Sequence, residues 1–582
     1  MGYYLISLLG LVPIFVILGI SFNLLLGYGG LLSVSHGAFF GTGAYTTAIL
    51  IKDYHLEFLP AVLAGALLAG VVSVTVGYAA GRLSDEFLFI VTIAVQVALV
   101  ELFNNLALTG RSAGISGIPR PTILGYRFDS GLKVMILSWV VCAVIAVLCW
   151  RVVRSPYGRL LKALREDVPA ARSLGKRALW TKVTVFAFSS AIAGVAGGLY
   201  ASHTLYISPA EFTLDRSVEI LSITIIGGLA AYWGPFLGAA VVLAIPEALS
   251  FADIPDSVAG PINGIVYTLA VLLLLIYRPQ GILGRGAAQE AEREARRKAA
   301  KAGREDAAEP APESSEPFPA LRRGDGGPDR AETLRCEDLG ISFGGLKAVD
   351  GVTLEIRPGK ITALVGPNGA GKTTVFNLLS GALKADTGHT FYGDQDISGL
   401  SIERRAQLGV VRSFQEVRLF ENMTVRENIH VAITDIREES LIGQFSPASF
   451  RRRGGEEARA EEMLRALGLH GKRHTLARDL SYAEQKMLMM GRLLATGASC
   501  YLLDEPMSGL DQGARAQLSE LLRRMVEGGT SICIVEHSMQ VVREVASWVM
   551  FLDHGRLLTE GTPEEVMNDP ALTAIYFGHA AA

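Results

Sequence analysis

Long apolar runs fill the first half of this 582-residue chain and constrain its fold more than any other feature. A helix needs about 20 apolar residues to cross a bilayer, so the runs predict an all-α polytopic membrane domain over residues 1–285 with about eight spans. The runs start at Leu5, Leu31, Leu59, Phe87, Lys133, Val183, Ile220 and Ile262. Several contain a proline (Pro13, Pro235, Pro246), which predicts that some spans are broken or re-entrant.

The first run, from Tyr3 to Leu26, has no basic leading segment and is followed by further apolar runs. It is therefore predicted to be a retained span rather than a signal peptide. The connection from Arg151 to Lys182 is rich in Lys and Arg, so the positive-inside rule places it in the cytoplasm. Arg278 and Arg285 place the end of the last run on the same side, and the rest of the chain follows there.

Polar residues within the runs are candidates for a solute pathway or for hydrogen bonds between helices, and the pattern does not separate these two roles. They are Ser33, Ser35, His36, Gln96, Glu101, Asn104, Asn105, Glu219 and Glu247. Pairs of glycines four residues apart predict close helix packing in lipid. These pairs are Gly37/Gly41, Gly77/Gly81, Gly194/Gly198 and Gly234/Gly238.

The second half has the composition of a soluble domain. Residues 286–332 form a predicted cytoplasmic linker, rich first in Ala and charge and then in Pro, Glu and Ser. Residues 333–582 are predicted to fold separately as an α/β domain. A net charge of −3 gives no support for nucleic-acid binding, and the five cysteines show no metal-binding spacing.

A nucleotide site is predicted at GPNGAGKTT, which has the spacing G-x-x-x-x-G-K-[ST]. A predicted buried strand, Ile361 to Val365, precedes it and a predicted helix, Thr374 to Leu379, follows it, which is the context that the motif requires. Backbone N–H groups of such a loop bind phosphate oxygens, the lysine reaches the β- and γ-phosphates, and the following hydroxyl binds Mg²⁺. The predicted ATP-binding residues here are Gly366, Asn368, Gly369, Gly371, Lys372, Thr373 and Thr374.

A second predicted strand, CYLLDEP, ends in two carboxylates. Asp504 suits Mg²⁺ coordination, and Glu505 is placed to polarise an attacking water. A third, TSICIVEH, ends at His537, which we expect to contact the γ-phosphate.

Residues 333–582 resemble the ATP-binding cassette of ABC transporters. The resemblance implies that Phe343 of SFGGLKAV stacks on adenine, that Gln415 of RSFQEVRLF senses Mg²⁺, and that MSGLD crosses a dimer interface. It also implies that His537 is the switch histidine. Both halves resemble the branched-chain amino acid importers, through NLLLGYGGLLSVSHGAFFGTGAY in the permease half and SFQEVRLFENMTVRENI in the ATPase half.

The resemblance implies a coupling segment in the basic cytoplasmic loop, at Ala170, Ala171 and Gly175, with Pro169 starting a short helix. An ordinary cytoplasmic turn is the alternative. The implied partners are a second permease, a second ATPase and an extracellular solute-binding protein in the cytoplasmic membrane of a prokaryote.

One segment departs from the family. The signature reads LSYAEQK, which keeps Ser481 as an implied γ-phosphate ligand but carries Ala483 where the family has glycine. Its Cβ is expected to hinder close backbone approach or any conformation with positive φ. We expect a heterodimer, in which only one of the two ATP sites carries this alanine.

The expected function is ATP-driven import of branched-chain amino acids. The first alternative is the same architecture with another small polar solute, such as urea, an amide or an aromatic acid. The second is a non-transporting ATP-binding switch, against which the intact Lys372, Asp504, Glu505 and His537 argue.

Overall fold

The computed structural model describes residues 2–250, 332–434, 439–445 and 447–569, residue 572, and single positions between 265 and 283. The predicted linker and the apolar run from Ile262 therefore lie largely outside the described residues. Contacts divide the chain into two units, which are described separately. The first comprises residues 1–165, 178–293 and 440–444, and the second comprises residues 166–177, 294–439 and 445–582.

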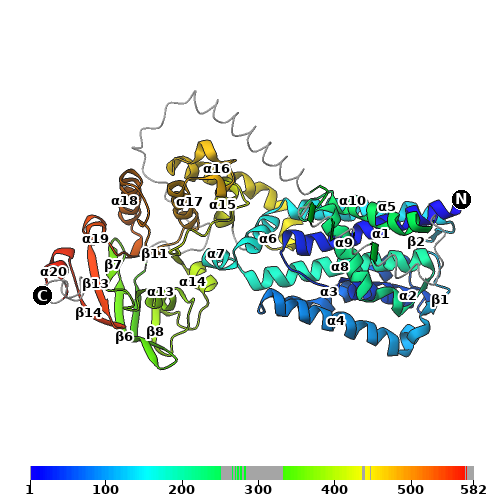
Figure 1. Ribbon diagram of the computed structural model, residues 1–582, viewed down its shortest axis with the longest axis horizontal. Coiled ribbons are helices and arrows are strands. Elements are labelled where there is room, and N and C mark those ends of the chain that lie inside the picture. Colours follow the sequence, from blue (N-terminus) through cyan, green and yellow to red (C-terminus); the bar gives the residue numbers. More distant parts are fainter. Residues whose placement is uncertain are drawn as a thin grey trace. The chain divides into compact units, whose positions relative to one another are not determined.

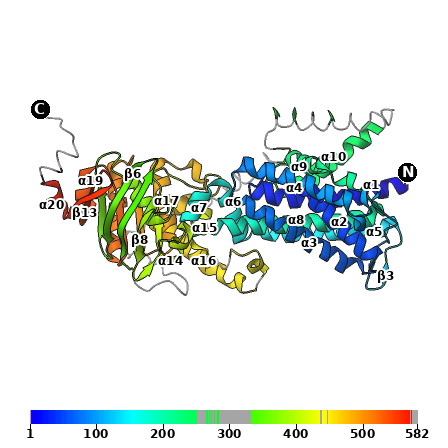
Figure 2. The same ribbon diagram turned by 90° about the horizontal axis from the view of Figure 1, so that it is seen from below.

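The first unit is a bundle of helices that run alongside one another (Figures 1 and 2). Its α-helices are α1 (Gly2–Phe22), α2 (His36–Lys52), α3 (Phe58–Ala80), α4 (Asp85–Asn105), α5 (Gly131–Val153), α6 (Pro156–Glu166), α8 (Ala178–Thr204), α9 (Leu214–Gly227) and α10 (Gly234–Ser250). A π-helix, η1 (Asn23–Tyr28), extends α1. Short 3₁₀ turns lie at Ala107–Thr109, Arg111–Ala113 and Pro209–Phe212. Two small antiparallel pairs join β1 (Ile115–Ser116) to β4 (Tyr206–Ile207) and β2 (Thr122–Ile123) to β3 (Tyr126–Arg127).

In the described part of the chain, five helices are long and apolar enough to cross a membrane. They are Ile6–Tyr28, Phe58–Ala80, Asp85–Asn105, Gly131–Val153 and Ala178–Thr204. The predicted runs from Leu31 and Ile220 correspond instead to shorter helices, α2 with 17 residues and α9 with 14. The count of about eight spans is thus not confirmed. Pro13 lies inside α1 without interrupting it.

Close helix crossings rest on small residues. A Cβ on Gly194 of α8 would lie 3.0 Å from the Cα of Ala66 in α3, and one on Gly198 would lie 2.7 Å from Oγ1 of Thr47 in α2. A Cβ on Gly238 would overlap the carbonyl oxygen of Ile223, so α9 and α10 pack backbone to backbone. Dispersion contacts between such close backbones hold helices together in lipid.

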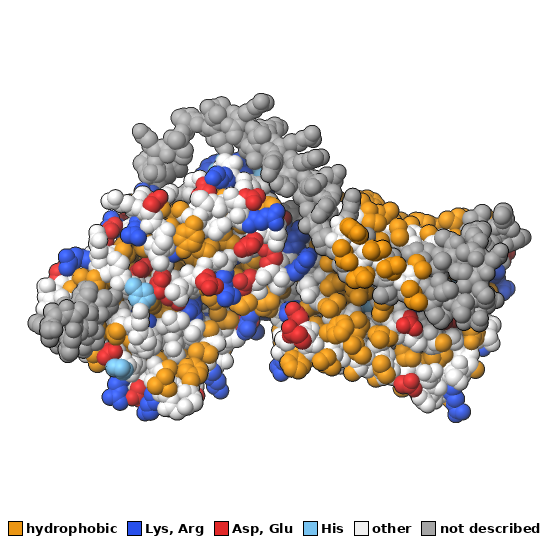
Figure 3. All heavy atoms as spheres, viewed as in Figure 1, with side chains coloured by type: hydrophobic (Ala, Val, Ile, Leu, Met, Phe, Trp, Pro, Cys, Tyr) orange, Lys and Arg blue, Asp and Glu red, His pale blue; other side chains and the backbone are white. Residues whose placement is uncertain are grey.

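Apolar side chains also cover much of the face of this unit that Figure 3 shows. Leu59, Leu63 and Leu67, four residues apart on α3, are 54–68% exposed, as expected for a face turned to lipid. The predicted polar residues divide into two groups. Ser33, Ser35, His36 and Gln96 are buried, whereas Glu101 and Asn105 are exposed and bonded to each other at 3.4 Å. Asn104 is half-buried, Glu219 pairs with Arg216 at 2.5 Å, and the Glu247 side chain lies outside the described residues.

Two places where helical structure is interrupted lie in contact inside the first unit. The α9–α10 hairpin turns at residues 228–233, where Ala230 has φ +58°. The Asn23 side chain, at the start of η1, accepts a hydrogen bond from Ala230 N and donates one to Ala231 O, both at 2.9 Å. One buried amide thus satisfies two backbone groups that the broken helix leaves free.

The second unit contains two sheets (Figure 2). The larger has the order β10-β11-β12-β7-β13-β14 and is parallel except for β14. Its strands are β7 (Ile361–Val365), β10 (Val410–Arg412), β11 (Cys500–Asp504), β12 (Ser531–Val535), β13 (Trp548–Asp553) and β14 (Arg556–Gly561). The smaller is antiparallel, with the order β6-β5-β8-β9, from β5 (Leu334–Phe343), β6 (Leu346–Ile356), β8 (Thr387–Tyr392) and β9 (Gln395–Asp396). Strands β7, β11 and β12 are wholly buried, which explains their continuous apolar sequence.

Helices surround these sheets. They are α13 (Lys372–Ser380), α14 (Ile402–Leu408), α15 (Val425–Ile433), α16 (Pro447–Ala466), α17 (Tyr482–Ala495), α18 (Gln512–Glu527), α19 (Met539–Val545) and α20 (Pro563–Met567). Short 3₁₀ turns lie at His470–Lys472 and Ala477–Asp479, whereas residues 442–444 of the turn Ile442–Phe445 belong to the first unit. One further helix, α7 (Val168–Ser173), belongs to the second unit although its sequence lies between α6 and α8 of the first.

Candidate nucleotide site

The predicted phosphate loop joins β7 to α13, at the edge of the sheet where its parallel strands end (Figure 1). Gly366, Gly369 and Gly371 have φ of +150°, +83° and +98°. A Cβ on Gly366 would overlap the carbonyl oxygen of Leu552, whereas a Cβ on Gly369 would meet nothing within 4 Å. Gly369 therefore keeps open the space above the loop, which a phosphate needs for close approach. Asn368 and Thr373 are exposed at this loop and at the start of α13, with Thr374 next to them.

Lys372 is the first residue of α13 and lies folded over the loop. Its Nζ donates to the carbonyl oxygens of Gly366 and Pro367, each at 2.8 Å, and its side chain is buried. Burial lowers the pKa of this ammonium, while the carboxylates of Glu505 and Asp504 oppose the shift. The Lys372 ammonium is thus bound by two backbone carbonyl oxygens, whose place phosphate oxygens could take.

Asp504 ends β11 at the same edge. Its Oδ2 lies 3.3 Å from a guanidinium nitrogen of Arg412 at the end of β10, and its N–H donates to Ser413 Oγ at 2.9 Å. Burial raises the pKa of the Asp504 carboxyl, and Arg412 opposes that shift. The same guanidinium also bonds Oδ1 of Asn377 in α13, so Arg412 links the carboxylate to the helix of the phosphate loop.

Glu505 brings the other predicted residues together. Its Oε1 accepts a hydrogen bond from Nε2 of Gln415 at 3.0 Å and lies 2.8 Å from Nε2 of His537. Its φ is +45°, an uncommon conformation for a residue with a Cβ, and strained residues of this kind gather at active sites. The fold thus joins three predicted residues that are up to 122 positions apart, from 415 to 537, at one carboxylate oxygen.

Phe343 and Ser481 lie outside this cluster. Phe343 ends β5 beside a Gly-Gly turn and is 50% exposed, as an aromatic platform for a base requires. Ser481 is the exposed N-cap of α17 and forms a capping box with Glu484. Ala483 is helical, so a positive φ is not needed there and only the expectation of hindered backbone approach remains.

The predicted coupling segment packs within the second unit. Asp167 caps α7 by accepting from Ala170 N at 2.7 Å, Pro169 lies in the first turn, and Gly175 ends the segment with φ +83°. Ala170 and Ala171 are fully buried. A short helix is thus present where it was predicted, but it runs from Val168 to Ser173, so it begins one residue before Pro169 and ends two residues before Gly175.

Polar contacts hold α7 against neighbouring elements. Gln407 of α14 donates to the Gly175 carbonyl at 2.8 Å, and Arg172 pairs with Glu403 of the same helix. Lys176 Nζ pairs with Glu439 at 2.5 Å and donates to the Thr434 carbonyl at 2.7 Å, with both side chains of the ion pair 5% exposed or less.

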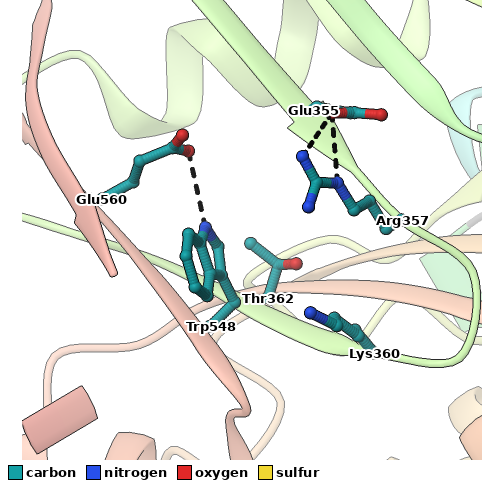
Figure 4. A pocket seen from close by; sticks show the side chains of 6 residues that line it. All are labelled: Glu355, Arg357, Lys360, Thr362, Trp548 and Glu560. Carbon is teal, nitrogen blue, oxygen red and sulfur yellow. Dashed lines mark hydrogen bonds and ion pairs between the residues drawn. The ribbon is translucent and has the colours of Figure 1, made fainter. Parts of the chain in front are cut away.

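A pocket on the second unit is lined by other residues than those of the predicted site (Figure 4). It is lined at the opposite strand ends, where Lys360 precedes β7 and Trp548 begins β13. Trp548 Nε1 donates to Glu560 at 3.4 Å and Arg357 pairs with Glu355 at 2.8 Å, so its polar groups bind one another. We assign it no role in nucleotide binding.

Comparisons with known proteins cover both units. The family described as "Branched-chain amino acid transport system / permease component" matches residues 4–277, and the family described as "ABC transporter" matches residues 349–508. The high-affinity branched-chain amino acid transport ATP-binding protein LivG of Escherichia coli K12 is 39% identical over 42% of this chain and 98% of its own length. The chain belongs to the branched-chain amino acid ABC transporter family.

The permease protein LivM of the same bacterium is 34% identical over 47% of this chain and 68% of its own length. A solved ATP-binding cassette of an ABC transporter, in its ADP conformation, matches 43% of this chain and 99% of its own length, with 30% identity and a TM-score of 0.37. The family matches and the LivG and LivM relatives together show that this ABC transporter chain joins, in one polypeptide, a permease and a nucleotide-binding ATPase subunit.

Sequence reasoning missed three residues of this ABC transporter's site. Arg412 holds Asp504, and Glu536 accepts from Met507 N at 2.9 Å. Lys486 donates to carbonyl oxygens of the loop after β11. A charged residue on the buried face of an apolar helix was the available signal for Lys486, since such a group is almost never buried without partners.

Proposed function

We propose that this chain imports branched-chain amino acids by hydrolysing ATP at Glu505, as the fused permease–ATPase subunit of an importer in the cytoplasmic membrane of a prokaryote. The observation that carries the proposal is the meeting of Glu505 with Gln415 and His537 at the edge that also holds the phosphate loop. The names of the LivG and LivM relatives support the choice of substrate.

The residues present fit ATP with Mg²⁺. Oxygen ligands suit this cation, and Thr373, Gln415 and Asp504 offer a hydroxyl, an amide and a carboxylate. Mg²⁺ supplies charge neutralisation at the β- and γ-phosphates when it is bound. Phe343 provides the aromatic face for adenine, and Lys372 exchanges its two backbone carbonyls for phosphate oxygens.

Glu505 acts as the base that orients water. Its carboxylate oxygen already contacts the donors of Gln415 and His537, so an approaching water and the γ-phosphate share one small site with both side chains. Asp504 stays in place because Arg412 neutralises its buried charge. We therefore assign catalysis to Glu505 and His537 and cation binding to Thr373, Gln415 and Asp504.

Movement reaches the permease through α7. Gln407 and Glu403 of α14 hold Gly175 and Arg172, and the buried pair of Lys176 with Glu439 anchors the end of the segment. Ala170 and Ala171 are apolar and fully buried, so helix α7 moves together with α14 as one packed body. This packing supports the proposed coupling role of Ala170, Ala171 and Gly175.

The chain is one half of a transporter. The second permease, the second ATPase and the solute-binding protein are separate chains. We infer a heterodimer, in which only one of the two signature segments carries Ala483; in a homodimer both would carry it. The test is ATP hydrolysis by the full-length chain purified in lipid with the subunits that accompany it. Glu505→Gln is expected to abolish turnover while nucleotide binding persists; unchanged turnover contradicts the proposal.

A further inference from the structure

Lys486 is a buried lysine that the mechanism above does not use. It is the fifth residue of α17, and its side chain is 1% exposed. A buried ammonium is costly unless its donors are satisfied. Burial lowers the pKa of Lys486, and the carboxylates of Glu536 and Glu505 oppose the shift. Its contacts therefore reveal what the group is there to hold.

The three donors of the ammonium all point to one loop. Nζ donates to the carbonyl oxygens of Glu505 at 2.9 Å, Pro506 at 3.2 Å and Ser508 at 2.7 Å. An ammonium has three N–H groups, so this loop uses its full capacity. These carbonyls belong to the segment in which Glu505 has its positive φ.

Glu536 holds the same loop from the opposite strand. Its Oε1 accepts from Met507 N at 2.9 Å, and its side chain is buried. Glu505 N donates to the carbonyl oxygen of Val535 at 2.9 Å. The loop therefore lies between a buried cation on α17, which binds its carbonyl oxygens, and a buried anion after β12, which binds an N–H group.

We propose that Lys486 is a positioning residue that fixes the backbone after β11, so that the Glu505 carboxylate stays directed at Gln415 and His537. The inference rests on the proposed function of Glu505. Helix α17 then carries both Ser481 of the signature segment and the lysine that positions Glu505. Ser481 caps this helix at its exposed end, five residues before Lys486. The position of the signature segment is thereby coupled to the catalytic glutamate of the same chain.

The hydrogen bonds of Lys486 explain how a movement of α17 would reach the loop. Three charge-assisted hydrogen bonds to main-chain oxygens resist any shift of α17 relative to the loop. When a partner's nucleotide engages Ser481 and draws α17, the loop and Glu505 move with it. Turnover at this site then depends on occupancy of the other.

The test compares three variants of the full-length chain, purified in lipid with its accompanying subunits. Lys486→Met removes the three donors at similar length, and Lys486→Arg restores several of them. Lys384→Met is the matched control, since Lys384 is exposed. We expect Lys486→Met to lower kcat about tenfold or more while KM for ATP changes less than about twofold. Lys486→Arg recovers part of kcat, and Lys384→Met matches the wild type.

Equal kcat in Lys486→Met and Lys384→Met would overturn the inference. So would a loss of ATP binding in Lys486→Met that accompanies the loss of kcat, because a general folding defect removes both. Glu505→Gln measured in parallel separates the two proposals. If it leaves turnover unchanged, the proposed function fails; if it abolishes turnover while Lys486→Met does not lower it, only the positioning role fails.

Discussion

Gly366 shows how a single atom constrains the nucleotide loop. Its φ of +150° is outside the range that side chains favour, and a Cβ would overlap the carbonyl oxygen of Leu552 in β13. The overlapping atoms belong to the backbone of Leu552, so no flexible side chain can move away to relieve the contact. Gly359 has a similar conformational demand, with φ +71°, but a Cβ there would meet nothing within 4 Å. Comparing substitutions at Gly366 and Gly359 therefore separates the cost of a positive φ from the cost of steric overlap.

We expect Gly366→Ala to weaken ATP binding about tenfold or more and to lower the free energy of unfolding by about 2 kcal/mol, because both strain and overlap act. Gly359→Ala is expected to cost about 1 kcal/mol from φ alone and to leave ATP binding intact. Thermal unfolding and nucleotide titration of the two variants check this. Equal losses in both would show that the overlap with Leu552 does not matter.

At the scale of elements, the α7 segment depends on a buried ion pair. Lys176 and Glu439 lie 2.5 Å apart with side chains 2% and 5% exposed. Removing one partner leaves the other charge buried and uncompensated, which costs far more than removing both. Such a pair fixes the position of the segment that follows Gly175.

Lys176→Met is expected to lower the unfolding midpoint by about 6 °C or more, since breaking a buried pair costs about 3 kcal/mol. The double variant Lys176→Met with Glu439→Gln should recover part of this loss, because it leaves no uncompensated charge. Thermal unfolding of the full-length chain measures both. A double variant no more stable than the single one would contradict the account of the pair.

A second prediction at the scale of elements concerns Asn23, whose side chain satisfies two backbone groups in the first unit. Asn23→Leu leaves Ala230 N and Ala231 O without the partner that each now has. Unsatisfied backbone groups in a membrane interior are costly, so we expect Asn23→Leu to lower the free energy of unfolding by about 2 kcal/mol. Asn105→Leu, on an exposed position of α4, is the control. Equal stability of the two variants in lipid would count against a structural role for the amide.

Sequence reasoning succeeded where spacing is strict. Strand β7 and the helix that follows the predicted phosphate loop have local signals, and the structure contains both. It also has a short helix at Pro169, which begins one residue earlier, at Val168. Helices α2 and α9 are shorter than a bilayer span, and an apolar run alone does not reveal where the backbone turns back. Lys486 was missed because its acceptors are main-chain oxygens 19 to 22 positions away, which no residue type marks.

At the scale of the whole molecule, Ala483 bears on the partner. It occupies the first turn of α17, beside Ser481. If the alanine hinders approach of the other subunit's nucleotide, Ala483→Gly should raise ATP turnover about threefold or more in the chain expressed alone, equal to about 0.7 kcal/mol. Substrate-stimulated hydrolysis by the unmodified chain alone would contradict the heterodimer.

The central claim is that hydrolysis at Glu505 drives uptake of branched-chain amino acids, and uptake of labelled leucine by the native host tests it most directly. Cells carrying Glu505→Gln, with the protein confirmed in the membrane, are compared with cells carrying the wild-type chain. The account predicts that uptake is lost in the variant, and that uptake by the wild type is competed by unlabelled isoleucine and valine. Unchanged leucine uptake in cells without a second leucine system would contradict it.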